Sequence, residues 1–190
     1  FITQKPANEM LRSLVGSEMC IRDRSRRPGI CGAVETLLID KEFHDSYGEE
    51  LINFLIAMGI EIRANKKLFN NKFVVAISDS DYGFEFLENI LAVKVVEDID
   101  GAISHIRNFG SNHTDCILTK DKSAREIFFK QLDSSILLCN ASTQFADGGE
   151  FGFGAEVGIS TNKMPPRGPV GLNQLVSYKY ELLGKGQVRK

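Results

Sequence analysis

The sequence predicts an α/β domain organised around parallel β-strands. Between residues 33 and 139, short apolar runs alternate with segments whose apolar residues recur at helical spacing. Helices of about ten residues between strands are typical of crossover connections in a parallel sheet. The composition, 43% hydrophobic and 25% charged over 190 residues, is that of one ordinary globular domain.

The first half of this region predicts one helix among several strands. The expected strands cover residues 34–39, 60–62, 73–77 and 90–96. A helix is expected over residues 47–58, because Leu51, Phe54, Leu55 and Met58 fall on one face. Gly59 stands where a helix is commonly terminated by glycine.

The second half continues the alternation and then loses it. Asp98 is expected to cap a helix that ends at Gly110, with an apolar face formed by Ile99, Ala102, Ile103 and Ile106. Strands at 115–118 and 135–139 flank another helix, whose face is Ala124, Ile127, Phe128 and Leu132. Residues 140–167 show no period, and long irregular segments of this kind are usually functional. Residues 175–188 are expected to form one or two edge strands.

Charge and hydropathy exclude several classes of protein. With 23 basic and 25 acidic residues, the net charge of −2 offers no footprint for nucleic acid or an anionic membrane. No apolar run approaches the ~20 residues of a membrane helix, and no signal peptide is visible, so we expect a cytoplasmic protein. Three scattered histidines and four irregularly spaced cysteines predict neither a metal site nor a disulfide framework.

Cys31 is the sharpest candidate for chemistry. It ends a loop, RRPGIC at 26–31, that leads into a buried strand, where a side chain can reach a sheet edge. Arg26 and Arg27 are expected to favour the reactive thiolate. The alternative is a buried structural thiol. Cys116 and Cys139 lie inside apolar strands and are expected in the core, whereas Cys20 lies in an unpatterned segment.

Polar residues at the ends of elements are the remaining candidates. Asn140, Ser142 and Thr143 follow a buried strand, where substrates commonly bind in parallel sheets, although turn and cap chemistry explains them equally well. His113 lies between a helix and a strand and is either a hydrogen-bond donor or acid, or a loop residue without a role. His44 and His105 are expected on helix surfaces.

Long motifs carry a resemblance to a known family. The segment CNASTQFADGGEFGFGAEVGIST at 139–161 resembles the signature of γ-glutamyl phosphate reductases. RPGIC at 27–31 looks like the family's catalytic-cysteine segment, and GSNHTD at 110–115 like another of its elements. The similarity runs from about residue 25 to 190. Two departures are Gly32, where Asn is expected, and Pro165-Pro166, where His-Ala is expected.

The resemblance implies an aldehyde dehydrogenase-like catalytic domain over residues 25–150, followed by a return segment and oligomerisation tail over 151–190. Members of the superfamily bind NADPH on an N-terminal Rossmann-like domain, which we expect to be missing from this chain. Residues 1–24 match nothing in the family, and 18–24 resemble a translated sequencing adapter. We therefore expect that segment to be artefactual, the alternative being a divergent N-terminus.

The resemblance also implies the reaction: NADPH reduces L-glutamyl 5-phosphate to L-glutamate 5-semialdehyde and phosphate, a step of proline biosynthesis. Cys31 would form a thioester, with its backbone N–H supporting the oxyanion. Asn140, Ser142, Thr143 and His113 would bind the substrate. Glu85 looks like the glutamate that contacts the nicotinamide ribose. A homo-oligomer and a glutamate 5-kinase partner are implied for the full-length enzyme, and this chain alone would be inactive.

Three other interpretations stay open. The chain could derive from a bifunctional pyrroline-5-carboxylate synthase, with a kinase domain fused upstream. It could belong to another thiol-dependent aldehyde dehydrogenase that acts on a free aldehyde. It could also be a non-catalytic binding or oligomerisation module, which the reactivity of its thiols would distinguish.

Overall fold

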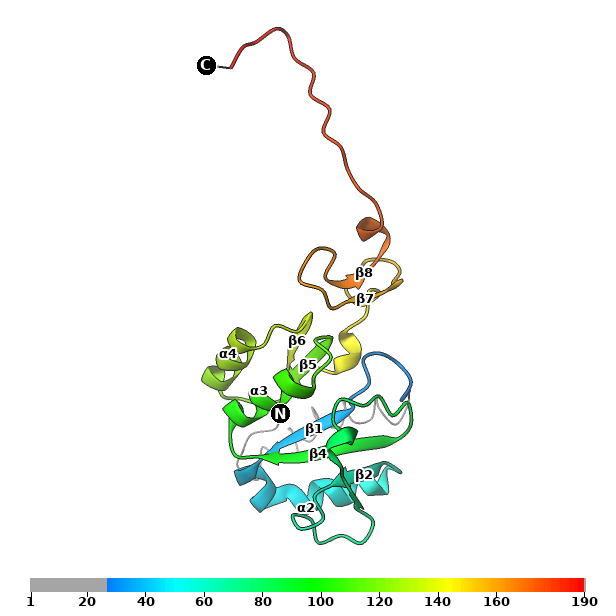
Figure 1. Ribbon diagram of the computed structural model, residues 1–190, viewed down its shortest axis with the longest axis vertical. Coiled ribbons are helices and arrows are strands. Elements are labelled where there is room, and N and C mark those ends of the chain that lie inside the picture. The colour runs from blue at the N-terminus through cyan, green and yellow to red at the C-terminus, as the bar shows by residue number, and fades with distance from the viewer. Residues whose placement is uncertain (1–26, 190) are drawn as a thin grey trace.

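The structure is a computed structural model that describes residues 27–189. Its body is an α/β unit with three small sheets, from which the C-terminal residues extend (Figure 1). The largest sheet is wholly parallel and has the strand order β1-β4-β2-β3. Its strands are β1 (Thr36–Asp40), β2 (Glu61–Ala64), β3 (Val75–Ala76) and β4 (Ile90–Val96). This confirms the predicted fold class.

The remaining strands form two pairs. Strands β5 (Thr114–Ile117) and β6 (Ile136–Cys139) are parallel, and β7 (Gly158–Ser160) and β8 (Gly168–Val170) are antiparallel. The helices are α2 (Lys41–Ala57), α3 (Ile99–Phe109) and α4 (Lys122–Gln131). Short 3-10 turns occur at η1 (Asp79–Asp81), η2 (Thr143–Phe145) and η3 (Leu172–Gln174).

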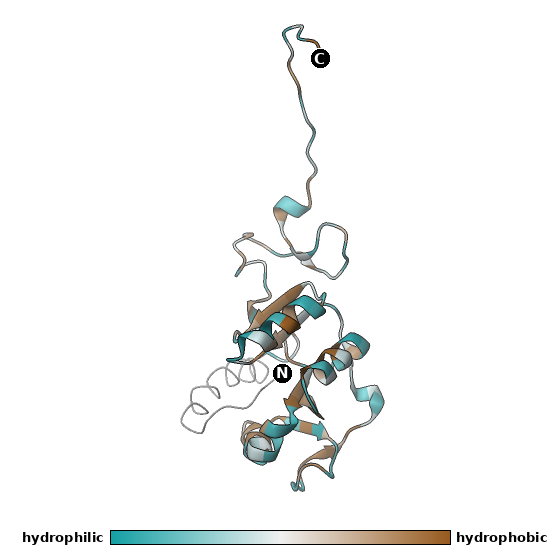
Figure 2. Ribbon diagram, turned by 90° about the vertical axis from the view of Figure 1, so that its left-hand side faces the viewer, coloured by the Kyte–Doolittle hydropathy of each residue, from teal (hydrophilic) through white to brown (hydrophobic). Residues whose placement is uncertain are grey.

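Helices cover the large sheet on both faces, and strand alternation assigns each side chain to a layer. In β1, Ile39 packs with α2, whereas Leu38 packs with α3 and α4 in a second cluster. Leu55 of α2 and Phe128 of α4 are fully buried in these two layers. Figure 2 shows the same division, with brown apolar strands and teal polar residues along the helices. Burial on both faces explains why the strands read as continuous apolar runs.

Capping residues determine where the helices begin and end. Asp98 caps α3 by accepting from the N–H of Gly101, and Gly110 follows its last turn, as predicted. Gly59 adopts a positive φ of 80° after α2, which also confirms its predicted role. However, α2 begins six residues earlier than expected, because Asp40 accepts from the N–H groups of Glu42 and Phe43.

The prediction of edge strands near the C-terminus is wrong. Residues 175–188 form no edge strand in the described structure, and their side chains are strongly exposed, with Tyr180 at 89% and Leu183 at 96%. A strand needs a partner edge, and Figure 1 shows this segment leading away from the body. In the antiparallel pair β7–β8, β7 lies inside the stretch expected to be irregular, and β8 begins directly after it.

The prediction that His44 and His105 lie on helix surfaces is also wrong. His105 is only 5% exposed and packs edge-on against Tyr82, with ring centroids 4.8 Å apart. The side chain of His44 is 14% exposed and lies against Phe69.

Within residues 27–189, no helix combines the length and apolar character that a membrane span requires. The same residues contain no group of three or more His, Cys, Asp or Glu side chains that could hold a metal ion.

Candidate active site

Most of the candidate residues line one cavity of about 200 Å³. Its walls come from the segment leading into β1, the loop before β4, the C-terminal end of α3, and β5. Cys31, Glu85, His113 and Thr143 all line it. Four segments distant in sequence therefore meet around the predicted nucleophile.

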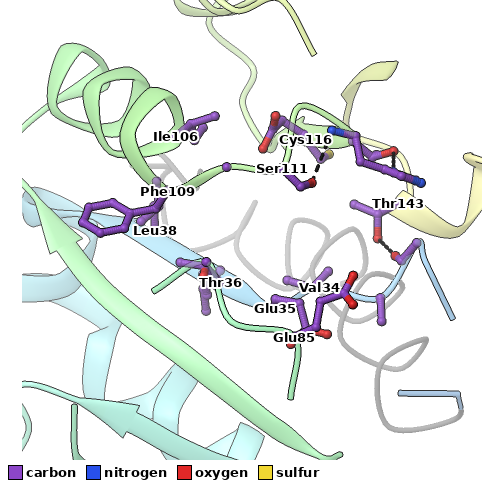
Figure 3. Close-up of a pocket in the computed structure, with 18 of the residues that line it drawn as sticks. Val34, Glu35, Thr36, Leu38, Glu85, Ile106, Phe109, Ser111, Cys116 and Thr143 are labelled. Carbon is purple, nitrogen blue, oxygen red and sulfur yellow. Dashed lines mark hydrogen bonds between the residues drawn. The ribbon is translucent and has the colours of Figure 1, made fainter. Parts of the chain in front are cut away.

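The cavity has two chemically different ends. Figure 3 shows Leu38, Ile106 and Phe109 gathered at one end and Glu35, Glu85, Ser111 and Thr143 toward the other. Its volume lies below the ~300 Å³ at which sites for drug-sized ligands begin, so it suits a short acyl chain better than a large ligand.

The loop that carries Cys31 is fixed against η2. Gly32 is buried, and a Cβ there would lie 2.9 Å from the carbonyl oxygen of Thr143, closer than side-chain atoms normally approach. The Thr143 hydroxyl in turn donates to the carbonyl of Gly32 at 2.5 Å. The N–H of Ala33 closes the turn on the carbonyl of Ile30. The backbone on both sides of Cys31 is therefore fixed, by the contact of Gly32 with Thr143 and by the hydrogen bond between Ala33 and Ile30.

The charge environment of Cys31 differs from the sequence expectation. Cys31 is exposed, yet partial desolvation is the first cause that raises the pKa of its thiol, and the negative charge of Glu156 is the second. The backbone N–H groups of Cys31 and Gly32 oppose this shift by favouring the thiolate. Arg27 is not among the causes, and Arg26 lies outside the described residues. Among the described residues, the backbone N–H groups of Cys31 and Gly32 are therefore the groups that favour the thiolate.

His113 lines the cavity, and one of its ring nitrogens has no hydrogen-bond partner among the described residues. Its Nδ1 lies 2.7 Å from the hydroxyl of Thr114, and its Nε2 is buried without a hydrogen-bond partner among the described residues. Burial lowers the pKa of His113, while the charges of Glu156, Glu85 and Asp115 oppose that shift. The ring is consequently neutral near pH 7 and can give or accept one hydrogen bond at Nε2.

Asn140 and Ser142 do not line this cavity. The Asn140 amide bridges the backbone of Thr119, accepting from its N–H at 2.9 Å and donating to its carbonyl at 2.7 Å. Ser142 accepts from the N–H of Gln144 and begins η2. These contacts join the ends of β5 and β6 and position Thr143. Substrate binding by Asn140 and Ser142 stays a prediction.

The other two cysteines of the described residues, Cys116 and Cys139, are only partly buried. Cys116 lines the cavity from β5, and its thiol lies 3.2 Å from the carbonyl of Ala141. Cys139 faces a shallow groove beside α4, and burial raises the pKa of its thiol. Core positions were expected for both. Cys139 does pack against the apolar cluster that contains Ile117 and Phe128, whereas Cys116 is not part of that cluster.

The site residues predicted from the sequence did not include Glu156. Its carboxylate accepts from the N–H of Gly148 at 2.7 Å and acts electrostatically on both Cys31 and His113. The residue lies inside the long motif at 139–161, but no period or spacing marked it there. The only sequence signal was an acidic side chain within a glycine-rich segment.

The described residues fit only part of a nicotinamide cofactor. The cavity lining contains three carboxylates, Glu35, Glu85 and Asp115, and among the described residues no Lys or Arg. A dinucleotide needs cationic or N–H groups for its phosphates. Glu85 is suited to accept hydroxyl hydrogens of a ribose, and no phosphate cradle accompanies it in this lining.

Comparison with solved structures defines the class of fold. An acetylating aldehyde dehydrogenase from Geobacillus thermoglucosidasius matches 90% of this chain and 48% of its own, with a TM-score of 0.56 and 16% identity. At this identity the match concerns the fold alone. Together with the cysteine at the cavity, it places the chain among proteins with an aldehyde dehydrogenase-like fold. No family model matches the chain.

More similar proteins specify the relationship. The γ-glutamyl phosphate reductase of Bartonella bacilliformis is 48% identical over 190 residues, which is 100% of this chain and 45% of the relative. The crystal structure of the Thermotoga maritima γ-glutamyl phosphate reductase has a TM-score of 0.85 and 38% identity, covering 95% of this chain and 43% of that one. The chain is thus a homologue of γ-glutamyl phosphate reductase, which confirms the resemblance.

The chain spans less than half the length of the curated relatives it matches. The alignment with the Bartonella protein includes residues 1–24, which were expected to match nothing in the family and which lie outside the described residues. The proposed boundaries at 24 and 150, and the artefactual nature of the first segment, stay predictions.

Proposed function

We propose that this chain carries the cysteine site of an enzyme that reduces L-glutamyl 5-phosphate to L-glutamate 5-semialdehyde, with release of phosphate. The observation that supports it most is the convergence of Cys31, His113 and Thr143 on one small cavity, within a chain 48% identical to a protein named for this activity. In the whole enzyme, we propose NADPH as reductant, a homo-oligomeric cytoplasmic assembly and glutamate 5-kinase as partner.

The step assigned to this chain is thioester formation. The thiolate of Cys31 attacks the acyl carbon, the bond from that carbon to the bridging phosphate oxygen breaks, and phosphate leaves with its electron pair. Negative charge develops on the acyl oxygen during the attack. The N–H groups of Cys31 and Gly32, which already favour the thiolate, are the donors proposed for that charge.

His113 and Thr143 are proposed to position the substrate. The unpaired Nε2 of His113 can donate to a phosphate or carboxylate oxygen, because the ring lines the cavity and is neutral near pH 7. Thr143 holds the cysteine loop through Gly32. When bound, NADPH supplies the hydride that reduces the thioester. Glu85 is proposed to contact its ribose, and residues outside the described part to hold its phosphates.

Substitution of Cys31 tests this proposal. In a complete enzyme carrying this segment, Cys31→Ser should abolish nearly all reductase activity, because losing a covalent nucleophile costs several orders of magnitude. Cys139→Ser is the matched control, since that thiol faces a groove on another side of β6, and it should retain most activity. Activity of Cys31→Ser above about a tenth of the unsubstituted rate would reject the nucleophile role.

A further inference from the structure

We infer that Glu35 is a positioning residue, whose carboxylate fixes the loop that carries Glu85 against the segment that carries Cys31. The inference rests on the proposed function, in which Cys31 forms the thioester and Glu85 contacts the ribose of the reductant. It assigns a role to a cavity side chain that the proposed function does not use.

Glu35 belongs to the same stretch of chain as Cys31. It follows the cysteine by four residues, lines the cavity with it and directly precedes β1. Its backbone carbonyl accepts from the N–H of Ala92 in β4 at 3.1 Å. This bond lies at the start of the β1–β4 ladder, where Thr36 is opposite Ala92. The main chain of Glu35 is therefore anchored to the sheet, and its side chain starts from a fixed point.

The carboxylate of Glu35 contacts the loop between β3 and β4. Its Oε2 accepts from the backbone N–H of Phe86 at 3.3 Å, across 51 positions of sequence. That N–H belongs to the planar peptide unit that joins Glu85 to Phe86, so the hydrogen bond restrains the main chain of Glu85 directly. Figure 3 shows Glu35 and Glu85 near each other at the polar end of the cavity.

The loop turns its successive side chains to different places at this point. Phe86 is buried, at 8% exposed, and the guanidinium carbon of Arg63 lies 4.9 Å from its ring centroid. Glu85 is exposed and lines the cavity. Leu87 adopts a φ of 56°, a left-handed conformation that is costly for a residue with a side chain. Such a bend persists where surrounding contacts define it, and Glu35 supplies one of these contacts from the cysteine segment.

Other contacts hold the loop to different parts of the fold. Asp81 accepts from the guanidinium of Arg63 in β2 at 2.9 Å. Gly83 has a φ of 77°, and a Cβ there would lie 2.7 Å from the carbonyl oxygen of Phe109 at the end of α3. These contacts fix the loop to β2 and α3, whereas Glu35 joins it to the segment of Cys31. Loss of the Glu35 carboxylate should therefore let the loop shift relative to the thiol.

Amide exchange, followed by NMR of the isotope-labelled chain, tests the contact itself. In Glu35→Ala, the N–H of Phe86 should exchange roughly tenfold faster, because it loses its acceptor. Glu35→Gln keeps an acceptor oxygen and should stay within about threefold of the unsubstituted chain. The N–H of Ala92, which bonds to the main chain of Glu35, is the internal control and should be unchanged in both variants. Asp79→Ala, which removes an exposed carboxylate of the same loop, should leave the Phe86 exchange rate unchanged.

A double-mutant cycle in a complete enzyme carrying this segment separates positioning from a structural role. With substrate generated in situ by glutamate 5-kinase and ATP, mass spectrometry reports acylation of Cys31, and the loss of NADPH absorbance reports reduction. Glu35→Ala should slow reduction about ten- to a hundredfold, since misplaced groups are costly, and change acylation by less than about threefold. It should add little to Glu85→Ala, because the two substitutions remove one coupled unit. Glu35→Gln should retain most of the rate.

Three results would overturn the positioning role alone. They are an unchanged Phe86 exchange rate in Glu35→Ala, equal losses in acylation and reduction, and additive effects of the substitutions at Glu35 and Glu85. Faster exchange at Ala92 together with Phe86 would assign Glu35 to general stability of the sheet and also overturn that role. If Glu85→Ala leaves NADPH oxidation unchanged, or Cys31 of the unsubstituted enzyme is not acylated, the proposed function fails and this inference fails with it.

Discussion

The hydroxyl of Thr143 donates a hydrogen bond of 2.5 Å to the backbone carbonyl of Gly32, although 111 positions separate the two residues. Thr143 is only 8% exposed, and it follows Ser142, which begins the η2 turn. One side chain therefore fixes the loop of the proposed nucleophile to the segment that follows β6. Two residues far apart in the sequence are therefore in contact at the site.

Removal of that hydroxyl should destabilise the fold. Thr143→Val keeps the shape of the side chain but leaves the carbonyl of Gly32 without this donor, which costs about 1–2 kcal/mol. In a domain of this size, the melting temperature should fall by roughly 2–8 °C. Thr143→Ser retains the hydroxyl and should lose less. Equal melting temperatures for the Val variant and the unsubstituted chain would show that the contact contributes nothing to stability.

A buried histidine should make stability depend on pH. The Nδ1 of His105 lies 3.1 Å from the ammonium of Lys94, and its ring stacks near Phe109 at 4.6 Å. Burial first, and the charge of Lys94 second, lower the pKa of His105 to about 4. The folded state therefore binds fewer protons than the unfolded state between pH 4 and 6.5, and stability rises with pH across that window.

His105→Gln isolates this effect. The unsubstituted chain should lose roughly 1–3 kcal/mol of unfolding free energy between pH 7.5 and pH 5, as measured by urea denaturation. The Gln variant should show a smaller loss over the same interval, whatever its stability at pH 7.5, because it lacks the titrating ring. Identical pH dependence in both proteins would mean that His105 does not titrate with this depressed pKa.

The sequence predicted the parts of the fold that short-range patterns determine. Strand β4 has the predicted limits 90–96, and α3 has the predicted caps Asp98 and Gly110, because apolar runs and capping side chains act within a few residues. The start of α2 was missed because residues 41–46 are largely polar. The pair of buried Phe43 and partly buried Tyr47, whose rings lie 5.5 Å apart at i and i+4, was the available signal.

Tertiary contacts determined what the sequence could not predict. His105 has the sequence context of a surface residue, and contacts with Tyr82, Lys94 and Phe109 bury it in the fold. The influence of Glu156 on Cys31 depends on a turn held by Gly148. The motif resemblance implied roles for six residues, and the fold brings four of them, Cys31, Glu85, His113 and Thr143, to one cavity. The other two, Asn140 and Ser142, do not line it.

Residues 1–24 should contribute little to stability. They show no sustained hydrophobic period, and their structure lies outside the described residues. Deletion of this segment should change the melting temperature by less than about 2 °C, because a sequence without a hydrophobic period is not expected to bury an apolar face. Differential scanning calorimetry of the full and shortened chains makes the comparison. A drop beyond that range would show that the segment packs against the domain and is not artefactual.

The 190-residue chain should not bind NADPH tightly or turn over substrate by itself. Hydride transfer requires the nicotinamide to be held against the thioester carbon, and that orientation supplies much of the rate. The cavity beside Cys31 offers Glu85 for a ribose, but its described lining provides three carboxylates and no Lys or Arg for the phosphates. Titration calorimetry should therefore detect no micromolar binding of NADPH at neutral pH, while Cys31 still reacts faster with iodoacetamide than Cys116 or Cys139.

Glu85→Gln removes one of the carboxylates and should leave the calorimetric result unchanged, since the missing phosphate contacts limit affinity. Micromolar binding, or NADPH-dependent turnover that disappears in Cys31→Ser, would show that the chain itself contains a complete cofactor site.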